Sequence, residues 1–309
     1  MIHAVDPIDG SEKWAFAPSG EAKKLKSRFA NDKMVDQKRT TYGLDGGMTF
    51  WRRGDGSTGV EHVLLYSGQR RGGRNYYGLD VTDAYSGGAP GLMWVIEGGT
   101  SGFQKLGQTW SSPVLAQVRV NGVATPVLIF NGGFDPITHD VEGAVNTAGD
   151  TVGNSIYIVN AWSGGLIWSA NNDGSDGAAI KNSDMKWSMP ASPAVVDLDF
   201  DGFVDNIYSV DLAGQIFRVD INNDNTSASD LAYRVKTFAQ LGITESNTDS
   251  DSVTNNRQFY AQPVVGSYDR GNGYILQVGI GSGNRVYPTN KDTEDRIYLI
   301  DDEEVLSAK

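Results

Sequence analysis

Residues 192–221 read SPAVVDLDFDGFVDNIYSVDLAGQIFRVDI, and this stretch decides the fold. Two short runs within it, residues 206–211 and 215–221, are rich in Val, Ile, Tyr and Phe and flank a turn that contains Gly214. Such runs between turn formers are typical of β-strands. A proline-led segment precedes them, and an aromatic-x-x-Asp motif lies in the second run. We interpret the stretch as successive antiparallel strands of one sheet.

The same pattern recurs along the chain. A Ser/Gln-Pro-Val/Ala segment starts at Ser112, Ser192 and Gln262, at intervals of 80 and 70 residues. A strand of the form aromatic-x-x-Asp/Asn follows each segment, and an earlier copy at residues 77–80 lacks the proline. Units that repeat in this way usually stack radially as the blades of a β-propeller. We therefore predict an all-β fold, a closed or partial β-propeller with blades of about four antiparallel strands.

Four such units follow a leading fragment at residues 1–16. The alternative is a β-sandwich, and three aligned copies of the Pro-then-aromatic pattern favour the propeller over it. The intervals exceed the usual blade repeat of about 40–50 residues, so long loops must decorate one rim. The predicted loops are residues 137–153, 170–186 and 241–257, and the predicted strands are residues 60–67, 75–81, 125–131, 155–160, 206–211, 215–221, 274–280 and 296–301.

We expect one propeller domain over residues 1–309, interrupted by a charged surface insertion at 20–36. The insertion has few apolar positions, so any helix there is short and lies on the surface. The prolines that lead the first strands are compatible with inner or edge positions, which can spare one amide donor.

Charge and cysteine content exclude several function classes. The chain has 26 basic and 38 acidic side chains, a formal charge of −12, so nucleic acid and acidic membrane surfaces are repelled and cations are favoured as partners. It has no cysteine, which excludes disulfides, thiolate catalysis, Cys-ligated zinc and iron–sulfur clusters. It has no apolar run of membrane-spanning length, and its first residues lack signal-peptide character.

The acidic loop, residues 197–205, carries the strongest chemical signal. Its carboxylates stand at relative positions 1, 3, 5 and 9, with glycine at position 6, and are Asp197, Asp199, Asp201 and Asp205. Hard oxygen ligands on a sharply turning loop suit Ca²⁺ better than Mg²⁺ or soft metals. The Phe203 carbonyl at position 7 would face the same centre. We therefore predict calcium held by five protein ligands, with a structural or regulatory role.

This loop is not an EF-hand. Tyr208 stands where a bidentate Glu is required, and a strand follows instead of a helix. The solvated acidic turn is the alternative interpretation. A similar stretch at residues 220–226 has Asn225 in place of glycine, so a plain turn is favoured there, as it is for residues 171–177.

Other motifs are weaker. His3, His62 and His139 lack the spacing of a metal site or a catalytic triad. No Gly-x-Ser-x-Gly elbow is present, and the glycines at 279–283 lack the dinucleotide fingerprint. The tripeptide Arg53-Gly54-Asp55 spells an integrin-recognition sequence within an expected hairpin loop at 52–59. It is a weak adhesion candidate, because matches of three letters are common by chance.

Several motifs together resemble the C-terminal β-propeller of the PilC/PilY family of type IV pilus tip adhesins. The resemblance extends over most of the chain, and the acidic loop running into Asp211-Leu212-x-Gly214 is its most specific element. The motifs are MIHAVD (1–6), GGRNYYGLDVT (72–82), WSSPV (110–114), VLIFNGG (127–133), SPAVVDLDFDGFVD (192–205) and YSVDLAGQIFRVD (208–220).

The resemblance implies a non-enzymatic protein at the cell surface or pilus tip of a Gram-negative bacterium, exported through the outer membrane. Its calcium loop would regulate pilus extension against retraction and support adhesion and twitching motility, with minor pilins and host or abiotic surfaces as partners. By the same analogy the four loop aspartates and the Phe203 carbonyl are the metal ligands. Family members carry a large N-terminal region, so we expect this chain to be a fragment of a longer adhesin.

Two other classes share features of the sequence. Ala4-x-Asp6-x-x-x-Gly10-x-x-x-Trp14 resembles the tryptophan-docking repeat of calcium-dependent quinoprotein dehydrogenases, with a degenerate copy at residues 159–168. Those enzymes typically also use a vicinal disulfide, which a chain without cysteine cannot form. A propeller of the outer-membrane assembly type shares the tryptophan repeat but lacks the acidic loop.

Overall fold

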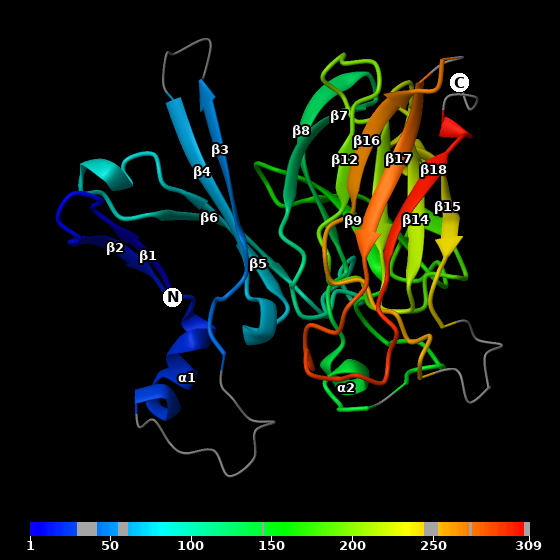
Figure 1. Cartoon of the computed structure of the whole chain (residues 1–309). Helices are drawn as coiled ribbons and strands as arrows, with labels where there is room; N and C mark the ends of the chain where they lie inside the picture. Colours follow the sequence, from blue (N-terminus) through cyan, green and yellow to red (C-terminus); the bar gives the residue numbers. More distant parts are fainter. Residues whose placement is uncertain (30–41, 55–60, 144, 244–252, 272–273, 306–309) are drawn as a thin grey trace.

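The computed structural model describes residues 1–309 except 30–41, 55–60, 144, 244–252, 272–273 and 306–309. Antiparallel sheets follow one another along the chain, and short helices lie at one end of them (Figure 1). A hairpin comes first, formed by β1 (Ile2–Val5) and β2 (Glu12–Phe16). The next sheet contains β3 (Met48–Gly54), β4 (Glu61–Gly68), β5 (Asn75–Asp80) and β6 (Gly91–Glu97).

Three more sheets complete the described chain. One contains β7 (Val114–Val120), β8 (Val123–Asn131), β9 (Ser155–Asn160), β10 (Leu166–Asn171) and β11 (Ile180–Lys181). The next contains β12 (Ala194–Val196), β13 (Asn206–Val210), β14 (Gln215–Ile221) and β15 (Ala232–Gln240). The last contains β16 (Val264–Asp269), β17 (Tyr274–Gly281) and β18 (Ile297–Asp302).

The helices are few and short. The main ones are α1 (Ser19–Phe29) and α2 (Pro136–His139), and 3₁₀ turns occupy Arg70–Gly72, Ala84–Ser86 and Ala228–Asp230. Helix α1 lies in the predicted charged insertion, and residues 30–36 of that prediction lie outside the described residues. Among the described helices, none has the length and apolarity needed to cross a bilayer.

The repeated sequence motifs occupy equivalent places in the sheets. β7, β12 and β16 each begin at the residue directly after a proline, and each is an edge strand of its sheet. The aromatic-x-x-Asp/Asn motif falls on the third strand of every multi-stranded sheet, namely β5, β9, β14 and β18. The four predicted units and the leading fragment are therefore present. The sheets β3–β6 and β12–β15 have the predicted four strands. The sheet β7–β11 has a fifth strand, β11, which pairs parallel with β10 inside the predicted loop 170–186, and β16–β18 has three described strands.

The leading strands of successive sheets lie side by side. The Thr49 hydroxyl donates a hydrogen bond to the Pro113 carbonyl, and the Ser112 N–H donates to Ser192 Oγ at 2.9 Å. Gln262 Nε2 donates to the Pro193 carbonyl at 2.7 Å. The same kind of contact thus joins the starts of β3, β7, β12 and β16. This places the leading strands innermost, as expected for propeller blades.

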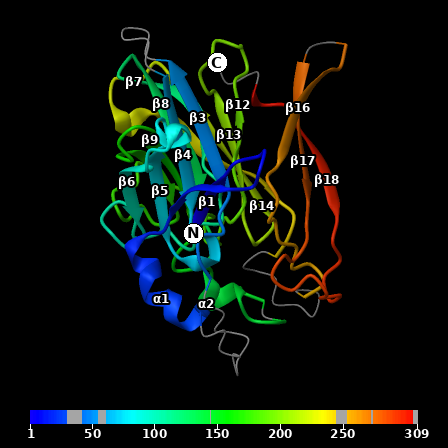
Figure 2. The same cartoon turned by 90° about the vertical axis from the view of Figure 1, so that its left-hand side faces the viewer.

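The core consists of layers between consecutive sheets (Figure 2). Residues such as Leu64, Tyr76 and Phe130 fill the layer between β3–β6 and β7–β11. Ile129, Ile158, Trp168, Ile207 and Phe217 belong to the layer between β7–β11 and β12–β15. Val210, Ile216, Leu276 and Val278 pack between β12–β15 and β16–β18. Each central sheet is therefore buried on both faces, which requires a neighbour on either side.

A buried ionic network also joins β12–β15 to β16–β18. Arg218 is fully buried, and its guanidinium donates to Asp302 at 2.6 Å and 2.7 Å and to Asp220 at 2.8 Å. The Tyr208 hydroxyl donates to Asp302 at 2.8 Å. Removing one member of such a network leaves buried charge without compensation.

We expect Arg218→Met to lower the free energy of unfolding by about 3–5 kcal/mol, because Asp302 and Asp220 would lose their shared buried partner. Urea denaturation followed by tryptophan fluorescence measures this change. Arg52→Met is the matched control, since Arg52 pairs with Glu61 in an exposed ion pair, and should cost less than about 1 kcal/mol. Equal losses in the two variants would contradict the role of the buried network.

Candidate metal centre

The acidic loop closes the hairpin between β12 and β13. Register pairs Ala194 with Tyr208 and Val196 with Asn206, so the chain must reverse between residues 197 and 205. In the view of Figure 1 this loop lies at the upper end of the molecule, opposite α2. The turn uses two left-handed residues, Phe200 at φ 60° and Gly202 at φ 90°. That conformation is costly for a phenylalanine and free for glycine.

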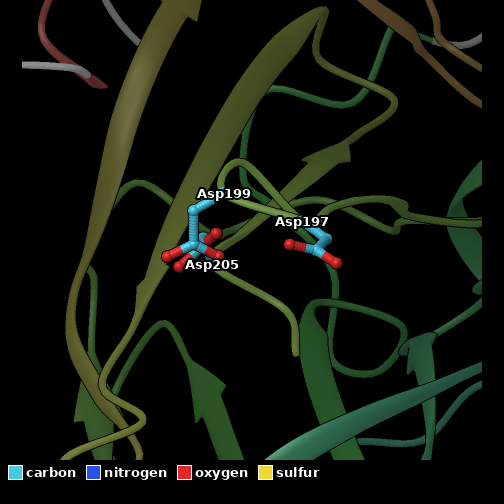
Figure 3. A group of neighbouring side chains, drawn as sticks. All are labelled: Asp197, Asp199 and Asp205. Carbon is cyan, nitrogen blue, oxygen red and sulfur yellow. The ribbon is translucent and has the colours of Figure 1, made fainter. Parts of the chain in front are cut away.

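Three of the four predicted carboxylates come together. Asp197, Asp199 and Asp205 each offer an oxygen, and these oxygens lie within 4.8 Å of one another. In Figure 3 the Asp199 and Asp205 carboxylates lie together, and the Asp197 carboxylate points toward them from the opposite side. The structure thus brings three of the five predicted ligand residues together, and metal binding by them stays a prediction.

Backbone N–H groups orient two of these carboxylates. The Leu198 N–H donates to Asp205 Oδ2 at 2.7 Å, and the Gly202 N–H donates to Asp197 Oδ2 at 2.9 Å. The other oxygen of Asp197, Oδ1, is inaccessible to solvent and accepts no hydrogen bond from the described residues. A buried carboxylate oxygen without a donor is costly, and a cation among the three carboxylates would compensate it.

Asp201 and Phe203 both contact Arg119, which lies on β7. The Arg119 Nη2 lies 3.5 Å from Asp201 Oδ2, and its guanidinium carbon lies 3.7 Å from the centre of the Phe203 ring. Asp201 Oδ1 accepts a hydrogen bond from the Phe203 N–H at 2.9 Å. Asp201 therefore sits beside an arginine and outside the group of three carboxylates. Its role as a ligand, like that of the Phe203 carbonyl, stays a prediction.

The turn after β14 positions Arg119. The Arg119 N–H donates to Asn223 Oδ1 at 3.0 Å, and the Asn121 N–H donates to Asn225 Oδ1 at 2.9 Å. These amide side chains fix the end of β7 against the acidic loop. Sequence reasoning missed Arg119 because it lies about 80 positions before the loop, on another sheet.

A groove of about 1220 Å³ opens beside the loop. Asp199, Asp201 and Asp205 line one part of it, and Asp224 and Arg234 line another. The groove therefore gives solvent and ions access to the carboxylates.

The other sequence candidates have structural partners. Asp220 forms ion pairs with Arg218 and Arg234, in agreement with the plain-turn interpretation of residues 220–226. Buried His139 contacts Asp150 at 2.7 Å between Nε2 and Oδ2, close to α2. Among the described residues, no hydrogen bond joins a serine hydroxyl to His139.

The predicted adhesion tripeptide is only partly described. Arg53 and Gly54 lie at the end of β3, and Asp55 lies outside the described residues. The Arg53 guanidinium stacks over Trp51 and Trp162, at 5.6 Å and 5.3 Å from the ring centres. Arg53 thus packs on the strand surface, and the predicted hairpin loop at 52–59 begins later because β3 continues to Gly54.

Comparison with known proteins identifies the family. The family described as the PilY1 beta-propeller domain matches residues 8–307. The chain belongs to this PilY1 β-propeller family. The match confirms the predicted fold class and the resemblance to the PilC/PilY adhesins.

Curated relatives of the chain agree with this family assignment. The type IV pilus biogenesis factor PilY1 homolog of Xylella fastidiosa is 27% identical over 292 residues, covering 91% of this chain and 17% of the relative. Type IV pilus biogenesis factor PilY1 of Pseudomonas aeruginosa (strain PAO1) is 25% identical over 297 residues, covering 91% and 22%. The chain thus spans about a fifth of the length of these relatives, as the two shares of 17% and 22% show.

A solved structure has the same fold. The crystal structure of the Pseudomonas aeruginosa PilY1 C-terminal domain matches with a TM-score of 0.62 and 23% sequence identity. The match covers 98% of this chain and 55% of that chain. The sheet arrangement of this PilY1 propeller is therefore shared with a solved relative.

Gly202→Ala should destabilise the PilY1 propeller by about 1 kcal/mol, because an alanine in the left-handed region is strained. A Cβ at this position meets no atom within 4 Å, so the loss is conformational and not steric. Gly266→Ala, where a Cβ also meets nothing and φ is not positive, is the control and should change stability by less than about 0.5 kcal/mol. Urea denaturation in EDTA measures both, and equal stabilities would contradict the strained turn.

Proposed function

We propose that the chain is a non-enzymatic, calcium-binding β-propeller of a type IV pilus-associated adhesin. The family match and the names of its relatives, which are pilus biogenesis factors, support the pilus association. The cluster of Asp197, Asp199 and Asp205 carries the calcium proposal. Because the chain corresponds to part of those relatives, the activity of the whole protein belongs to the proposal.

The donor set fits calcium. Three carboxylates supply hard oxygen ligands and three negative charges, and no sulfur or imidazole donor belongs to the group. Calcium takes six to eight oxygens in flexible geometry, whereas Mg²⁺ demands a near-ideal octahedron and keeps its waters. The unpartnered Asp197 Oδ1 gains a counter-charge when a cation binds. Calcium supplies charge neutralisation and a link between β12 and β13.

Asp201 and the Phe203 carbonyl are proposed as further ligands, and Arg119 competes for Asp201. The guanidinium contacts both the Asp201 carboxylate and the Phe203 ring, so it stabilises the loop when the cation is absent. Its positive charge also opposes cation entry. The loop therefore has two alternative counter-charges, an arginine and a metal ion.

In a pilus-associated protein, replacement of Arg119 by a calcium ion as the counter-charge of the acidic loop could couple calcium concentration to pilus function. Calcium binding would stiffen one end of the propeller, and we propose that this change adjusts pilus extension against retraction, adhesion and twitching motility. The proposed location is the cell surface or pilus tip of a Gram-negative bacterium, after export through the outer membrane. Minor pilins and host or abiotic surfaces are the proposed partners.

Isothermal titration calorimetry tests the ligand set. Asp205→Asn removes one negative charge and keeps an oxygen for the Leu198 N–H, so we expect calcium affinity to fall at least tenfold. Asp224→Asn removes a carboxylate that lines the same groove outside the cluster and should leave affinity unchanged. Equal affinities of wild type and Asp205→Asn would reject the site.

Arg119→Gln should raise calcium affinity several-fold, because the variant frees Asp201 and removes a positive charge near the carboxylates. The same titration measures it, with Arg234→Gln as control, since Arg234 lines the groove but pairs with Asp220. A fall in affinity on removing Arg119 would contradict the competition between arginine and metal.

The biological part of the proposal is tested in a piliated strain that carries Asp205→Asn in the chromosomal copy. Twitching zones and surface pilus counts are measured with and without added calcium. We expect the calcium response to disappear in the variant while the protein is still exported. An unchanged response would reject the regulatory role, and dye reduction with pyrroloquinoline quinone and an alcohol would instead favour the quinoprotein alternative.

A further inference from the structure

A second cluster of charged and aromatic residues lies at the other end of the sheets, outside the acidic loop. Trp110 precedes β7, Tyr260 precedes β16, and Phe134 follows β8, so loops from separate sheets meet there. Trp110 stacks on Phe134 with ring centres 4.7 Å apart, and Tyr260 lies 6.1 Å from Trp110. These rings form an aromatic floor near the starts of the innermost strands.

Two arginines from the turn after β4 cover this floor. The guanidinium carbons of Arg70 and Arg71 lie 4.5 Å and 5.2 Å from the centre of the Trp110 ring. Arg70 takes a left-handed backbone conformation, φ 50°, and its N–H donates to the Thr109 hydroxyl at 3.1 Å. The turn is thus fixed in a strained shape that holds both guanidinium groups against one indole.

These guanidinium groups are poorly satisfied. Each has a long ion pair, Arg70 with Asp45 at 3.7 Å and Arg71 with Asp140 at 3.9 Å. Neither side chain donates a hydrogen bond to any described residue. A guanidinium carries five N–H donors in a planar fork, so most of the donors in this cluster remain available.

The Tyr260 hydroxyl is a further hydrogen-bond donor in this cluster. It is only 9% exposed, and its hydroxyl is inaccessible to solvent and has no hydrogen-bond partner among the described residues. A buried hydroxyl without a partner costs about 1–3 kcal/mol. The native protein tolerates such a group where a ligand or an ordered molecule compensates it.

Three arginines, Arg70, Arg71 and Arg285, lie close together here in a chain whose formal charge is −12. Burial and the neighbouring positive charge of Arg285 lower the pKa of Arg70, and Asp45 opposes that shift. Asp45 and Asp140 are the ion-pair partners of Arg70 and Arg71, and the negative charges of Asp140 and Asp150 also act on the Tyr260 hydroxyl. An anion bound among crowded guanidinium groups accepts charge-assisted hydrogen bonds and reduces their mutual repulsion.

We propose that Arg70, Arg71 and the Tyr260 hydroxyl form a binding site for an oxyanion group, beside Trp110 at the end of the sheets where β7 and β16 begin. The planar fork of arginine matches the paired oxygens of a carboxylate or a phosphate. This site is separate from the acidic loop, because Trp110 lies just before the start of β7, whereas Arg119 at the end of β7 contacts the loop.

The test uses the full chain labelled with 5-fluorotryptophan, which gives one ¹⁹F signal for each of its 7 tryptophans. The Trp110 signal is assigned with Trp110→Phe. D-glucuronate, inorganic phosphate and sulfate are titrated at constant ionic strength in EDTA. We expect at least one anion to move the Trp110 signal saturably. Glucuronate binding alone assigns a carboxylate ligand, and phosphate or sulfate binding alone assigns a tetrahedral oxyanion.

Three variants establish the site. Arg71→Gln should weaken binding at least tenfold, and Tyr260→Phe, which keeps the ring and removes only the hydroxyl, should weaken it at least threefold. Arg53→Gln is the matched control, because Arg53 also stacks on tryptophan but lies on β3 away from the cluster. The proposal is overturned if no anion moves the Trp110 signal saturably, or if Arg53→Gln weakens binding as much as Arg71→Gln.

Discussion

Burial of both faces of each central sheet is the constraint on which the rest of the structure depends. The sheets β7–β11 and β12–β15 have apolar layers on either side, so neither can fold without its neighbours. Stacking of the sheets satisfies this requirement for β7–β11 and β12–β15 by giving each of them a neighbour on either side. It also directs the loops to the two ends of the sheets, where backbone can turn without losing buried hydrogen bonds. Both candidate binding sites of this molecule lie in loops at those ends.

Much of this architecture could be predicted from the sequence, because its signals are local. A proline directly before β7, β12 and β16 is allowed only where an amide donor is not needed, and these strands are edges. β9 and β14 agree with predicted strands because continuous apolar runs between turn formers are typical of buried strands. Strand β11, two residues long, has no such signal. Its pairing with β10 is set by tertiary contacts.

In the acidic loop, too, one part of the arrangement could be predicted from the sequence and another part could not. The spacing of Asp197, Asp199 and Asp205 predicted their convergence, because nine residues must close one hairpin. The contact between Arg119 and Asp201 was not predictable, since it depends on how two sheets pack and on amide side chains in a third loop. The cluster around Trp110 was also missed. Its members come from loops of different sheets and form no motif in the sequence.

Acidic groups in this region differ in their partners, and this difference explains why only the acidic loop is proposed as a cation site. Asp220 is balanced by Arg218 and Arg234, which come from its own sheet and are fixed by strand register. In the acidic loop, the cationic side chain in contact, Arg119, is directed to Asp201, while backbone N–H groups orient Asp197 and Asp205. Neutral donors reduce the repulsion among carboxylates but do not cancel their charge. Strand pairing thus supplies counter-charges inside the sheet, whereas the loop at the end of the sheets gathers three carboxylates, two of which backbone N–H groups orient.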